Sequence, residues 1–397
     1  MLIASLGCGE SSPAALPDPA PSDTVTPEVT PGEVAQTDTT PAPPPPALLR
    51  RGLVLPEDSI PCVTDDGESS DSCNHHGSSV TVTDDGTVLV TWYHGHREKS
   101  LDSKILWARL PPDAEEFEHW EVLYDEPERA QGNPVLWIND QTGDWQLFFI
   151  TLFGPTWNDG QIKMITSADR GATWSPPAVL REELNWMVRN KPIRLSNGEL
   201  LLPCYDEFLY TPTFLVSGDD FASSWEEIDM FFADPPAVGL IGKIQPTVLE
   251  RDDNTLVALM RNENEQAEQR AWQFTSSDQG RTWSEASLSA VPNCGNSMEM
   301  IELRSGAWII VFNNSHQRRF PLSVALSDDQ GRTWSAVADI QAECPVERCS
   351  FGYPSIAQNP VDETIWVTYT HNRRAIGWVQ LNERFVRESS STFATPE

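Results

Sequence analysis

The chain has 397 residues, 39% of them hydrophobic, and its 15 Trp support a core large enough for one big domain or two ordinary ones. The formal net charge of −32 at pH 7 excludes a nucleic-acid-binding surface, because such a surface has to be basic. An acidic chain attracts an anionic ligand only through a local cluster of arginines. No apolar run is long enough to form a membrane-spanning helix.

Residues 1–8 resemble the end of a bacterial lipoprotein signal, because Ser5-Leu6-Gly7-Cys8 follows a short apolar start. Cys8 would then be the lipidated residue and would provide the only contact with a membrane. No Lys or Arg precedes this stretch, which is consistent with a true start further upstream, and an ordinary disordered N-terminus is the alternative. We expect an exported bacterial protein, either a cell-envelope lipoprotein or a secreted one.

Residues 9–49 are rich in Pro, Thr, Ser and acidic residues, and they contain no Lys or Arg. Such a segment cannot bury enough apolar surface to fold. Its prolines favour an extended chain. We therefore expect a disordered linker that holds the following domain away from its anchor.

Seven Cys are scattered along the chain without a C-x-x-C pair, which argues against a zinc-binding pattern. The spacing of two pairs would close small loops as disulfides in an oxidising compartment. These pairs are Cys62 with Cys73 and Cys344 with Cys349. Two further cysteines either pair with each other or stay free: Cys204 and Cys294. We expect neither a metal site nor a cofactor.

From about residue 50 the chain consists of short β-type runs. Six segments share one form, in which a short strand, a turn and a second apolar strand follow one another at intervals of about 55 residues. These segments are 78–93, 133–150, 192–205, 246–261, 298–313 and 354–370. Four strands fit each interval, so we predict an all-β, six-bladed β-propeller over residues 50–388, followed by a disordered tail at 389–397. Residues 51–55 would supply the outer strand that the sixth blade lacks.

The pattern S-x-D-x-G-x-T-W occurs three times, at 167–174, 276–283 and 327–334, and a decayed copy without the Gly occurs at 217–225. The Asp accepts backbone N–H bonds, the Gly supplies a positive φ and the Trp packs beneath the turn. We interpret these phrases as structural turns between the third and fourth strands of the blades. The phrase is the Asp box, or bacterial neuraminidase repeat, and through it the chain resembles the sialidase (neuraminidase) superfamily.

The resemblance implies an exo-alpha-sialidase type of glycoside hydrolase, in which arginines bind the substrate carboxylate, a Tyr is the nucleophile and an Asp is the acid/base. Arg261 and Arg319 match the positions of two carboxylate-binding arginines, and Tyr353 matches the nucleophile. Asp102 would be the acid/base, with Glu98 as its rival. The implied partner is an anionic glycan.

Two positions depart from the pattern of the family. His76 stands where the family has its first Arg, and Gln245 stands where it has the Glu that activates the Tyr. Because a Gln cannot take a proton, either Glu299 or His76 would act as the base, or the reaction would differ. The propeller register places further polar residues at the same rim. We expect four of them to bind substrate: Asn133, Arg189, Lys191 and Glu299. Further residues stand at the rim without an assigned role: His75, Arg97, Tyr205, Glu207, Lys243, Asn296, Asn313, Arg373 and Arg374.

Two other functions remain open. His76 and Tyr353 could serve as base and acid in a polysaccharide lyase, or the chain could be a different glycosidase that acts on uronate-containing glycans. Loss of the first Arg and of the Glu also fits a carbohydrate-binding propeller without catalysis. The fold alone does not decide among the three.

Overall fold

The structure is a computed structural model that describes residues 47, 49–57, 59–64, 66–70, 73–231, 239–263 and 268–395. These residues belong to one compact unit. The lipoprotein-type signal at 1–8, with Cys8, and almost all of the linker expected at 9–49 lie outside the described residues. Within the described part, no helix is long and apolar enough to cross a membrane.

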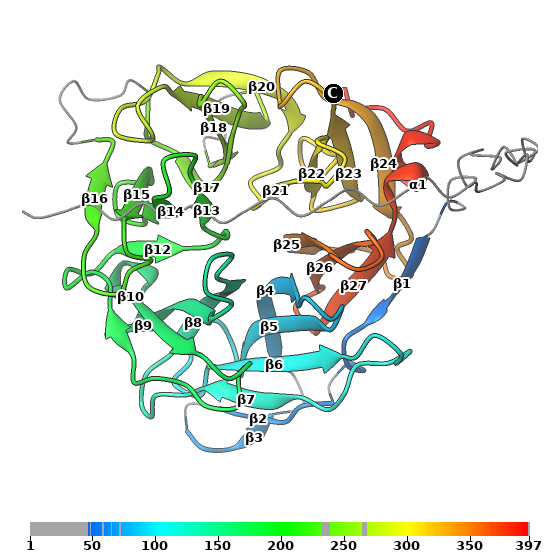
Figure 1. The fold of residues 1–397 in the computed structure, drawn as a ribbon. Helices are drawn as coiled ribbons and strands as arrows, with labels where there is room; N and C mark the ends of the chain where they lie inside the picture. The colour runs from blue at the N-terminus through cyan, green and yellow to red at the C-terminus, as the bar shows by residue number, and fades with distance from the viewer. Residues whose placement is uncertain are drawn as a thin grey trace, which may run out of the picture. The chain divides into compact units, whose positions relative to one another are not determined.

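Six antiparallel sheets follow one another around a central axis, which confirms the predicted six-bladed β-propeller (Figure 1). The first blade contains β4 (Asn74–Val82), β5 (Val88–Gly95), β6 (Lys104–Leu110) and β7 (Glu121–Tyr124). The second contains β8 (Gln131–Ile138), β9 (Trp145–Leu152), β10 (Gly160–Ser167) and β11 (Ala178–Val179), with the 3-10 helix η1 (Trp157–Asp159) before β10. The third contains β12 (Trp186–Val188), β13 (Ile193–Arg194), β14 (Leu200–Asp206), β15 (Thr211–Ser217) and β16 (Glu226–Asp229).

The fourth blade contains β17 (Lys243–Glu250), β18 (Leu256–Asn262), β19 (Arg270–Ser276) and β20 (Ser287–Pro292). The fifth contains β21 (Glu299–Glu302), β22 (Trp308–Asn313), β23 (Leu322–Ser327) and β24 (Ser335–Gln341). The sixth contains β25 (Phe351–Gln358), β26 (Ile365–His371), β27 (Ala375–Leu381) and β1 (Leu49–Leu53). A small hairpin of β2 (Cys62–Val63) and β3 (Ser69–Ser70) lies outside the blades, and helix α1 (Glu383–Arg387) follows β27.

The second strand of each blade is its most apolar element. β5, β9 and β14 are buried along their whole length, because both faces of a blade pack against neighbouring blades. One core cluster therefore joins the second and third blades, with Phe148 and Leu202 among its members, and another joins the fifth and sixth, with Val311 and Val367. Packing from blade to blade fixes which strand ends meet at the axis.

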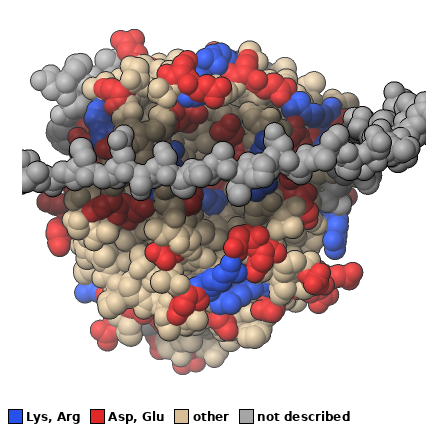
Figure 2. Space-filling model, viewed as in Figure 1, with Lys and Arg blue, Asp and Glu red and all other residues tan. Residues whose placement is uncertain are grey.

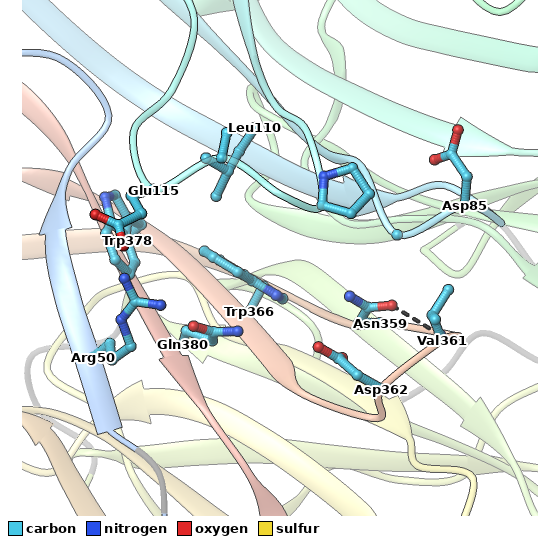
Figure 3. Close-up of a pocket in the computed structure, with 13 residues that line it drawn as sticks. Arg50, Asp85, Leu110, Glu115, Asn359, Val361, Asp362, Trp366, Trp378 and Gln380 are labelled. Atoms are coloured by element: carbon cyan, nitrogen blue, oxygen red, sulfur yellow. Dashed lines mark hydrogen bonds between the residues drawn. The ribbon is translucent and has the colours of Figure 1, made fainter.

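The ring closes with strands from both ends of the described chain. β1 pairs antiparallel with β27, from Leu49 opposite Leu381 to Leu53 opposite Gly377, and the blue β1 lies beside the red β27 in Figure 1. The predicted closing strand therefore exists, two residues earlier than the expected 51–55. A pocket of about 120 Å³ lies at this seam, where Arg50 of β1 and Trp378 of β27 line it together with the β4–β5 and β25–β26 hairpins (Figure 3).

Deleting residues 1–55 is expected to prevent the propeller from folding, because the deletion removes the whole β1 ladder and exposes the edge of β27. Far-ultraviolet circular dichroism and gel filtration would report the loss of a compact monomer. Deletion of residues 1–46 alone is the control and should leave the ring intact. A stable monomer starting at residue 56 would show that β1 is dispensable.

The Asp boxes lie between the third and fourth strands of the second, fourth and fifth blades, as predicted. The carboxylates of Asp169, Asp278 and Asp329 each accept the N–H of the Thr four residues later at 2.7 to 2.8 Å, and its hydroxyl at 2.6 Å. In the decayed copy, Asp219 accepts a Ser hydroxyl at 2.6 Å in the same way, and Phe221 adopts the positive φ of the missing Gly. Their carboxylates are thus occupied by their own turns.

Both predicted disulfides are present, Cys62–Cys73 and Cys344–Cys349. They indicate an oxidising, extracellular or otherwise exported environment. The remaining two cysteines within the described residues are not paired with each other: Cys204 and Cys294.

The end of the chain is more ordered than we expected. Ser391 forms a β-bridge with Val337. The side chain of Asn314 donates to the carbonyl of Thr392 at 2.8 Å and accepts from the N–H of Ala394 at 2.7 Å. These contacts hold the segment against the fifth blade. The prediction of a disordered tail over 389–397 is therefore wrong for 389–395, and the last two residues lie outside the described part.

Candidate functional site

Four innermost strands share a kink close to their first residues. In β4, β8, β17 and β25 the pairing with the second strand of the blade shifts by one residue. The residue at each kink has a positive φ: Gly77, Asn133, Gln245 and Tyr353. For a residue other than Gly this backbone is strained, and it persists only where the surrounding structure enforces it. A Pro follows each of the last three residues, and all three side chains line the same cavity.

This cavity, of about 220 Å³, lies at the end of the axis where the innermost strands begin. Its walls come from several blades and are mostly polar. The lining residues are Tyr93, Glu98, Asn133, Trp157, Met187, Tyr205, Glu207, Tyr210, Ile244, Gln245, Arg261, Glu263, Arg319, Tyr353 and Arg373. The sequence prediction that this rim gathers charged and aromatic groups agrees with the structure.

Tyr353 is surrounded by cations. Its hydroxyl accepts a hydrogen bond from Arg261 at 2.8 Å and lies 3.5 Å from the amide nitrogen of Gln245. The guanidiniums of Arg189 and Arg319 each lie 5.4 Å from the centre of its ring. Burial by itself raises the pKa of the Tyr353 phenol, but Arg261, Arg319 and the Gln245 amide outweigh burial and hold that pKa below its ordinary value. These donors and charges favour the phenolate, and the Glu98 carboxylate in the same cavity opposes them.

Three arginines line the cavity, although acidic side chains outnumber basic ones over the face shown in Figure 2. Arg261 forms an ion pair with Glu263, and Arg373 forms one with Glu98. Arg319 donates to the carbonyl of Gly295 at 3.1 Å and has no carboxylate partner within the described residues. Because a chain with 59 Asp and Glu against 27 Lys and Arg repels anions overall, this cluster is the local exception that an anionic ligand requires.

His76 lies behind the phenol, at the wall formed by the first blade. It is 1% exposed, its Nδ1 lies 2.8 Å from the hydroxyl oxygen of Thr370, and its ring centre lies 4.2 Å from that of Tyr353. Its Nε2 is 3.2 Å from a carboxylate oxygen of Glu98. Burial, followed by the charge of Arg373, holds the pKa of His76 well below its usual range. The imidazole is therefore neutral, and it does not replace the charge of the family's first Arg.

Arg373 supplies a guanidinium on the side of the cavity where His76 lacks one. It belongs to the loop between β26 and β27 in the sixth blade, whereas the family's first Arg belongs to the first blade. Its ion pair with Glu98 places the charge within reach of His76. The repeat register placed Arg373 at the rim but could not show that it completes a group of three arginines.

Asp102 does not line the cavity, contrary to its expected role as acid/base. Its carboxylate accepts the N–H of His96 at 3.0 Å, the hydroxyl of Ser100 at 2.6 Å and the N–H of Val63 at 3.2 Å. The carboxylate thus holds the loop after β5 against the β2–β3 hairpin. Of the two acids proposed for this role, Glu98 is the one that lines the cavity.

Lys191 and Glu299 also lie outside the cavity lining, although we expected both to bind substrate. The ammonium of Lys191 lies 3.0 Å from both carboxylate oxygens of Glu299. The same carboxylate accepts the hydroxyl of Ser355 at 2.7 Å and the N–H of Ile356 at 2.8 Å. This buried network joins the third, fifth and sixth blades across the axis. Its observed contacts are structural, and Glu299 is not placed beside the Tyr353 hydroxyl.

Arg189 likewise uses its hydrogen bonds for structure. It is 2% exposed, and one of its nitrogens donates to the carbonyls of Tyr353 at 2.6 Å and Pro354 at 3.0 Å. It therefore holds the strained backbone of the kink. Asn133 and Gln245 do line the cavity, and their amides lie 3.4 and 3.3 Å from the hydroxyl oxygen of Tyr205.

Glu207 and Glu263 also line the cavity, and only Glu207 was placed at the rim from the sequence. The Glu207 carboxyl has no hydrogen-bond or ion-pair partner within the described residues. Burial raises its pKa to about 7 against the charge of Arg261, and Glu263 adds to the rise. Glu263 follows the Arg-Asn pair at the end of β18, a signal that could have placed it at the rim. Such a carboxyl in a cleft is typical of a functional site.

The comparisons with known proteins agree with the fold. The description "BNR repeat-like domain" belongs to the family model that matches residues 86–367. At the level of whole sequences, no curated protein matches the chain. Solved structures share the propeller at low identity. The Hadza microbial sialidase Hz136 has a TM-score of 0.65 and 16% identity, over 78% of this chain and 66% of that protein.

Two further structures resemble the chain in the same way. The intramolecular trans-sialidase from Ruminococcus gnavus has a TM-score of 0.64 and 12% identity, over 79% of this chain and 96% of its own. The Trypanosoma rangeli sialidase has a TM-score of 0.61 and 14% identity, over 84% of this chain and 59% of its own. Identities this low establish the fold alone. The family model, in contrast, spans well over half of the sequence, and the chain therefore belongs to the BNR repeat-like family of sialidase-like propellers.

Proposed function

We propose that the protein is a sialidase-like glycoside hydrolase that releases a terminal acidic sugar from glycans. The observation that carries this proposal is the Tyr353 hydroxyl, held 2.8 Å from Arg261 in a cavity that Arg319 and Arg373 also line. A nucleophile among guanidiniums suits a sugar whose reacting carbon bears a carboxylate, because a phenol approaches that anionic centre more easily than a carboxylate does. The names of the similar structures support the same class of substrate.

In the proposed reaction, Arg261, Arg319 and Arg373 bind the sugar carboxylate. Tyr353 first gives its phenolic proton to solvent. The phenolate oxygen then forms a bond to the anomeric carbon while the bond to the leaving group breaks, and the leaving oxygen takes a proton from Glu98. Water then attacks the same carbon, gives a proton back to Glu98 and releases Tyr353 as the phenolate. Each step balances with water as the only co-reactant.

Ionisation of Tyr353 needs no neighbouring base in this scheme. Gln245 occupies the position of the family's Glu, and its amide nitrogen lies 3.5 Å from the phenol oxygen, so it can donate to a phenolate. Arg261 provides a second donor and a full charge. The departure at residue 245 therefore changes how the nucleophile is activated and leaves the rest of the chemistry possible.

Glu98 begins as the ion-pair partner of Arg373. A bound substrate carboxylate would compete with Glu98 for this guanidinium. Displacement of Glu98 from Arg373 would leave its carboxyl group free to contact the leaving oxygen.

A panel of sialosides and uronate oligosaccharides, assayed for released sugar, tests the proposal. We expect hydrolysis of at least one glycoside with a terminal acidic sugar and none of its neutral counterparts. Hydrolysis of neutral glycosides alone, or no turnover of any member, would contradict the proposal. We further propose that the protein is exported and anchored at Cys8.

A lyase is the second candidate, and the neutral imidazole of His76 favours it. The His76 ring centre lies 4.2 Å from that of Tyr353, so the two side chains could serve as base and acid in a β-elimination on a uronate. The product would be an unsaturated uronate that absorbs ultraviolet light, whereas hydrolysis produces no such absorbance. The same panel, read at both signals, separates the two reactions.

Glu207 should make binding of the acidic product depend on pH. Below about pH 7 its carboxyl is neutral, and above that value it becomes an anion near Arg261 that repels the ligand carboxylate. We expect the affinity to fall by about tenfold as the pH rises through 7, from like-charge repulsion at partly screened distances. Titrations from about pH 5.5 to 8.5 in the wild type and in Glu207→Gln would measure this fall.

The pH effect should be absent in Glu207→Gln. Glu302→Gln is the matched control. Burial also raises the pKa of Glu302, but this residue is the last one of β21, at the end of the innermost strand that points away from the cavity. The charged or titratable groups that act on Glu207 are Arg261, Glu263, Lys99 and Asp206. An unchanged pH profile in Glu207→Gln would assign the dependence to another group.

A further inference from the structure

We propose that a groove beside Arg319 is a second anion-binding subsite, which holds an acidic group on the unit next to the terminal sugar. This inference rests on the proposed function and specifies its substrate as a glycan with two neighbouring acidic groups. The groove has a volume of about 730 Å³. It is lined by Gln317, Arg318, Arg319, Phe320, Cys344, Val346, Glu347, Arg348, Cys349 and Ser350.

The groove and the cavity of the candidate site share one lining residue. Arg319 lines both spaces, and its backbone carbonyl accepts the N–H of Phe351 at 2.7 Å, which ties the loop of the fifth blade to the first residue of β25. Tyr353 lies two residues further along the same strand. A ligand whose carboxylate meets Arg319 in the cavity would therefore bring its next unit close to the groove.

Two guanidiniums in the groove have no partner among the residues that the structure describes. The side chains of Arg318 and Arg348 have no ion pair or hydrogen-bond partner within the described part of the chain. Elsewhere, arginines such as Arg170 and Arg281 contact carboxylates, as expected in a chain with a net charge of −32. With Arg319 the groove has three cationic side chains against one acid, Glu347. This local excess of positive charge attracts an anion.

The groove also has an apolar floor on a stabilised frame. Phe320 packs against Phe351 with ring centres 5.8 Å apart, and Val346 is 52% exposed. The disulfide Cys344–Cys349 closes the loop that carries Val346 and Arg348. An acidic sugar presents an apolar ring face and a charged carboxylate or sulfate, so it matches a floor of this kind with a cationic rim.

The charges in the cavity and in the groove indicate whether the unit next to the terminal sugar should be acidic or neutral. The cavity binds one carboxylate through Arg261, Arg319 and Arg373 in the proposed function, and the groove adds Arg318 and Arg348 outside it. A glycan with a neutral unit next to the acidic sugar would leave both outer guanidiniums unpaired. We therefore infer that an acidic sugar linked to another acidic sugar is preferred over the same sugar on a neutral unit.

The test compares two probes in the Tyr353→Phe background, where turnover does not interfere with binding. The probes are an α2,8-linked disialic acid and sialyllactose, whose second unit is neutral, and isothermal titration calorimetry measures each Kd. We expect the charged probe to bind about tenfold more tightly at low salt. The double variant Arg318→Ala/Arg348→Ala should remove this preference and leave sialyllactose unaffected. The preference should also shrink at about 0.5 M salt, where charges are screened.

Arg304→Ala is the matched control, because it removes an exposed arginine from the distant β21–β22 hairpin and should change neither Kd. Equal binding of both probes, or an equal loss for both in the double variant, would overturn the subsite while the proposed function stands. If neither probe binds to any variant, both the subsite and the sialoside form of the proposed function fail.

Discussion

Replacing Tyr353 with Phe is expected to lower kcat on an acidic-sugar glycoside by about a thousandfold or more, while the Kd of the released acid changes by less than about twofold. The substitution removes the oxygen that forms the covalent bond. It keeps the ring that packs against His76, and it leaves Arg261, Arg319 and Arg373 free to bind the carboxylate. Steady-state kinetics and calorimetry on the same preparation would separate the two quantities.

Tyr369→Phe is the matched control for this experiment. Tyr369 belongs to the same blade, is 2% exposed and packs against Phe351, away from the cavity lining. Its substitution should leave kcat and Kd unchanged. If Tyr353→Phe retains the wild-type rate, Tyr353 is not the nucleophile. If it loses binding and turnover together, its role is to position the arginines.

Removal of the Glu299 carboxylate is expected to destabilise the propeller by about 3–5 kcal/mol, because Glu299→Gln leaves the buried ammonium of Lys191 without its counter-ion. The Ser355 hydroxyl and the Ile356 N–H would also lose a charged acceptor. Chemical denaturation of wild type and variant would show this as a lower midpoint. A double variant, Lys191→Met/Glu299→Leu, should be less destabilised than the single variant, since it removes both charges together.

This experiment also distinguishes a structural role from the substrate-binding role expected from the sequence. If the pair is structural, Glu299→Gln lowers the stability and leaves the KM of the folded enzyme near its wild-type value. A change in KM with unchanged stability would restore the original expectation for Lys191 and Glu299.

The contribution of the Lys191–Glu299 pair to the stability of the fold should depend on pH. Burial alone raises the pKa of Glu299, but Lys191, the Ile356 N–H and the Ser355 hydroxyl outweigh burial and hold it below the ordinary value. A lowered pKa in the folded state stabilises the fold above the unfolded pKa of Glu, and this contribution is lost as the pH falls through the folded pKa. Acid should therefore narrow the difference in stability between the wild type and Glu299→Gln.

The fold could be predicted from the sequence because the sequence signals of each blade repeat at a regular interval. Each blade repeats a strand, a turn and an apolar second strand, and the Asp boxes mark the same turn in several blades, so the number of blades and the closing strand follow from spacing. Tyr353, Arg261 and Arg319 could be placed at one rim for the same reason. The structure brings these three together within one cavity.

The roles of individual rim residues could not be derived from spacing. Asp102 and Glu98 lie in one loop, and only the three-dimensional path of that loop decides which carboxylate turns toward the axis. Glu299 begins β21 and Lys191 lies in the short connection between β12 and β13. The kink at Gln245 directs its side chain into the cavity, whereas the side chains of Lys191 and Glu299 face each other. In three blades a Pro directly follows the residue at the kink, but this signal alone is not sufficient, because a Pro also follows Lys191, which pairs with Glu299 outside the cavity lining.

The pairing of β1 with β27 has a consequence for the order of events during synthesis. The first strand of the ring leaves the ribosome or the export channel long before its partner, and the sixth blade cannot be completed until Leu381 is available. Until then β1 has no partner, and its unpaired edge is a template for association with other chains. Chains that end prematurely should therefore accumulate as aggregates rather than as smaller propellers, and the complete ring is a checkpoint for full-length product.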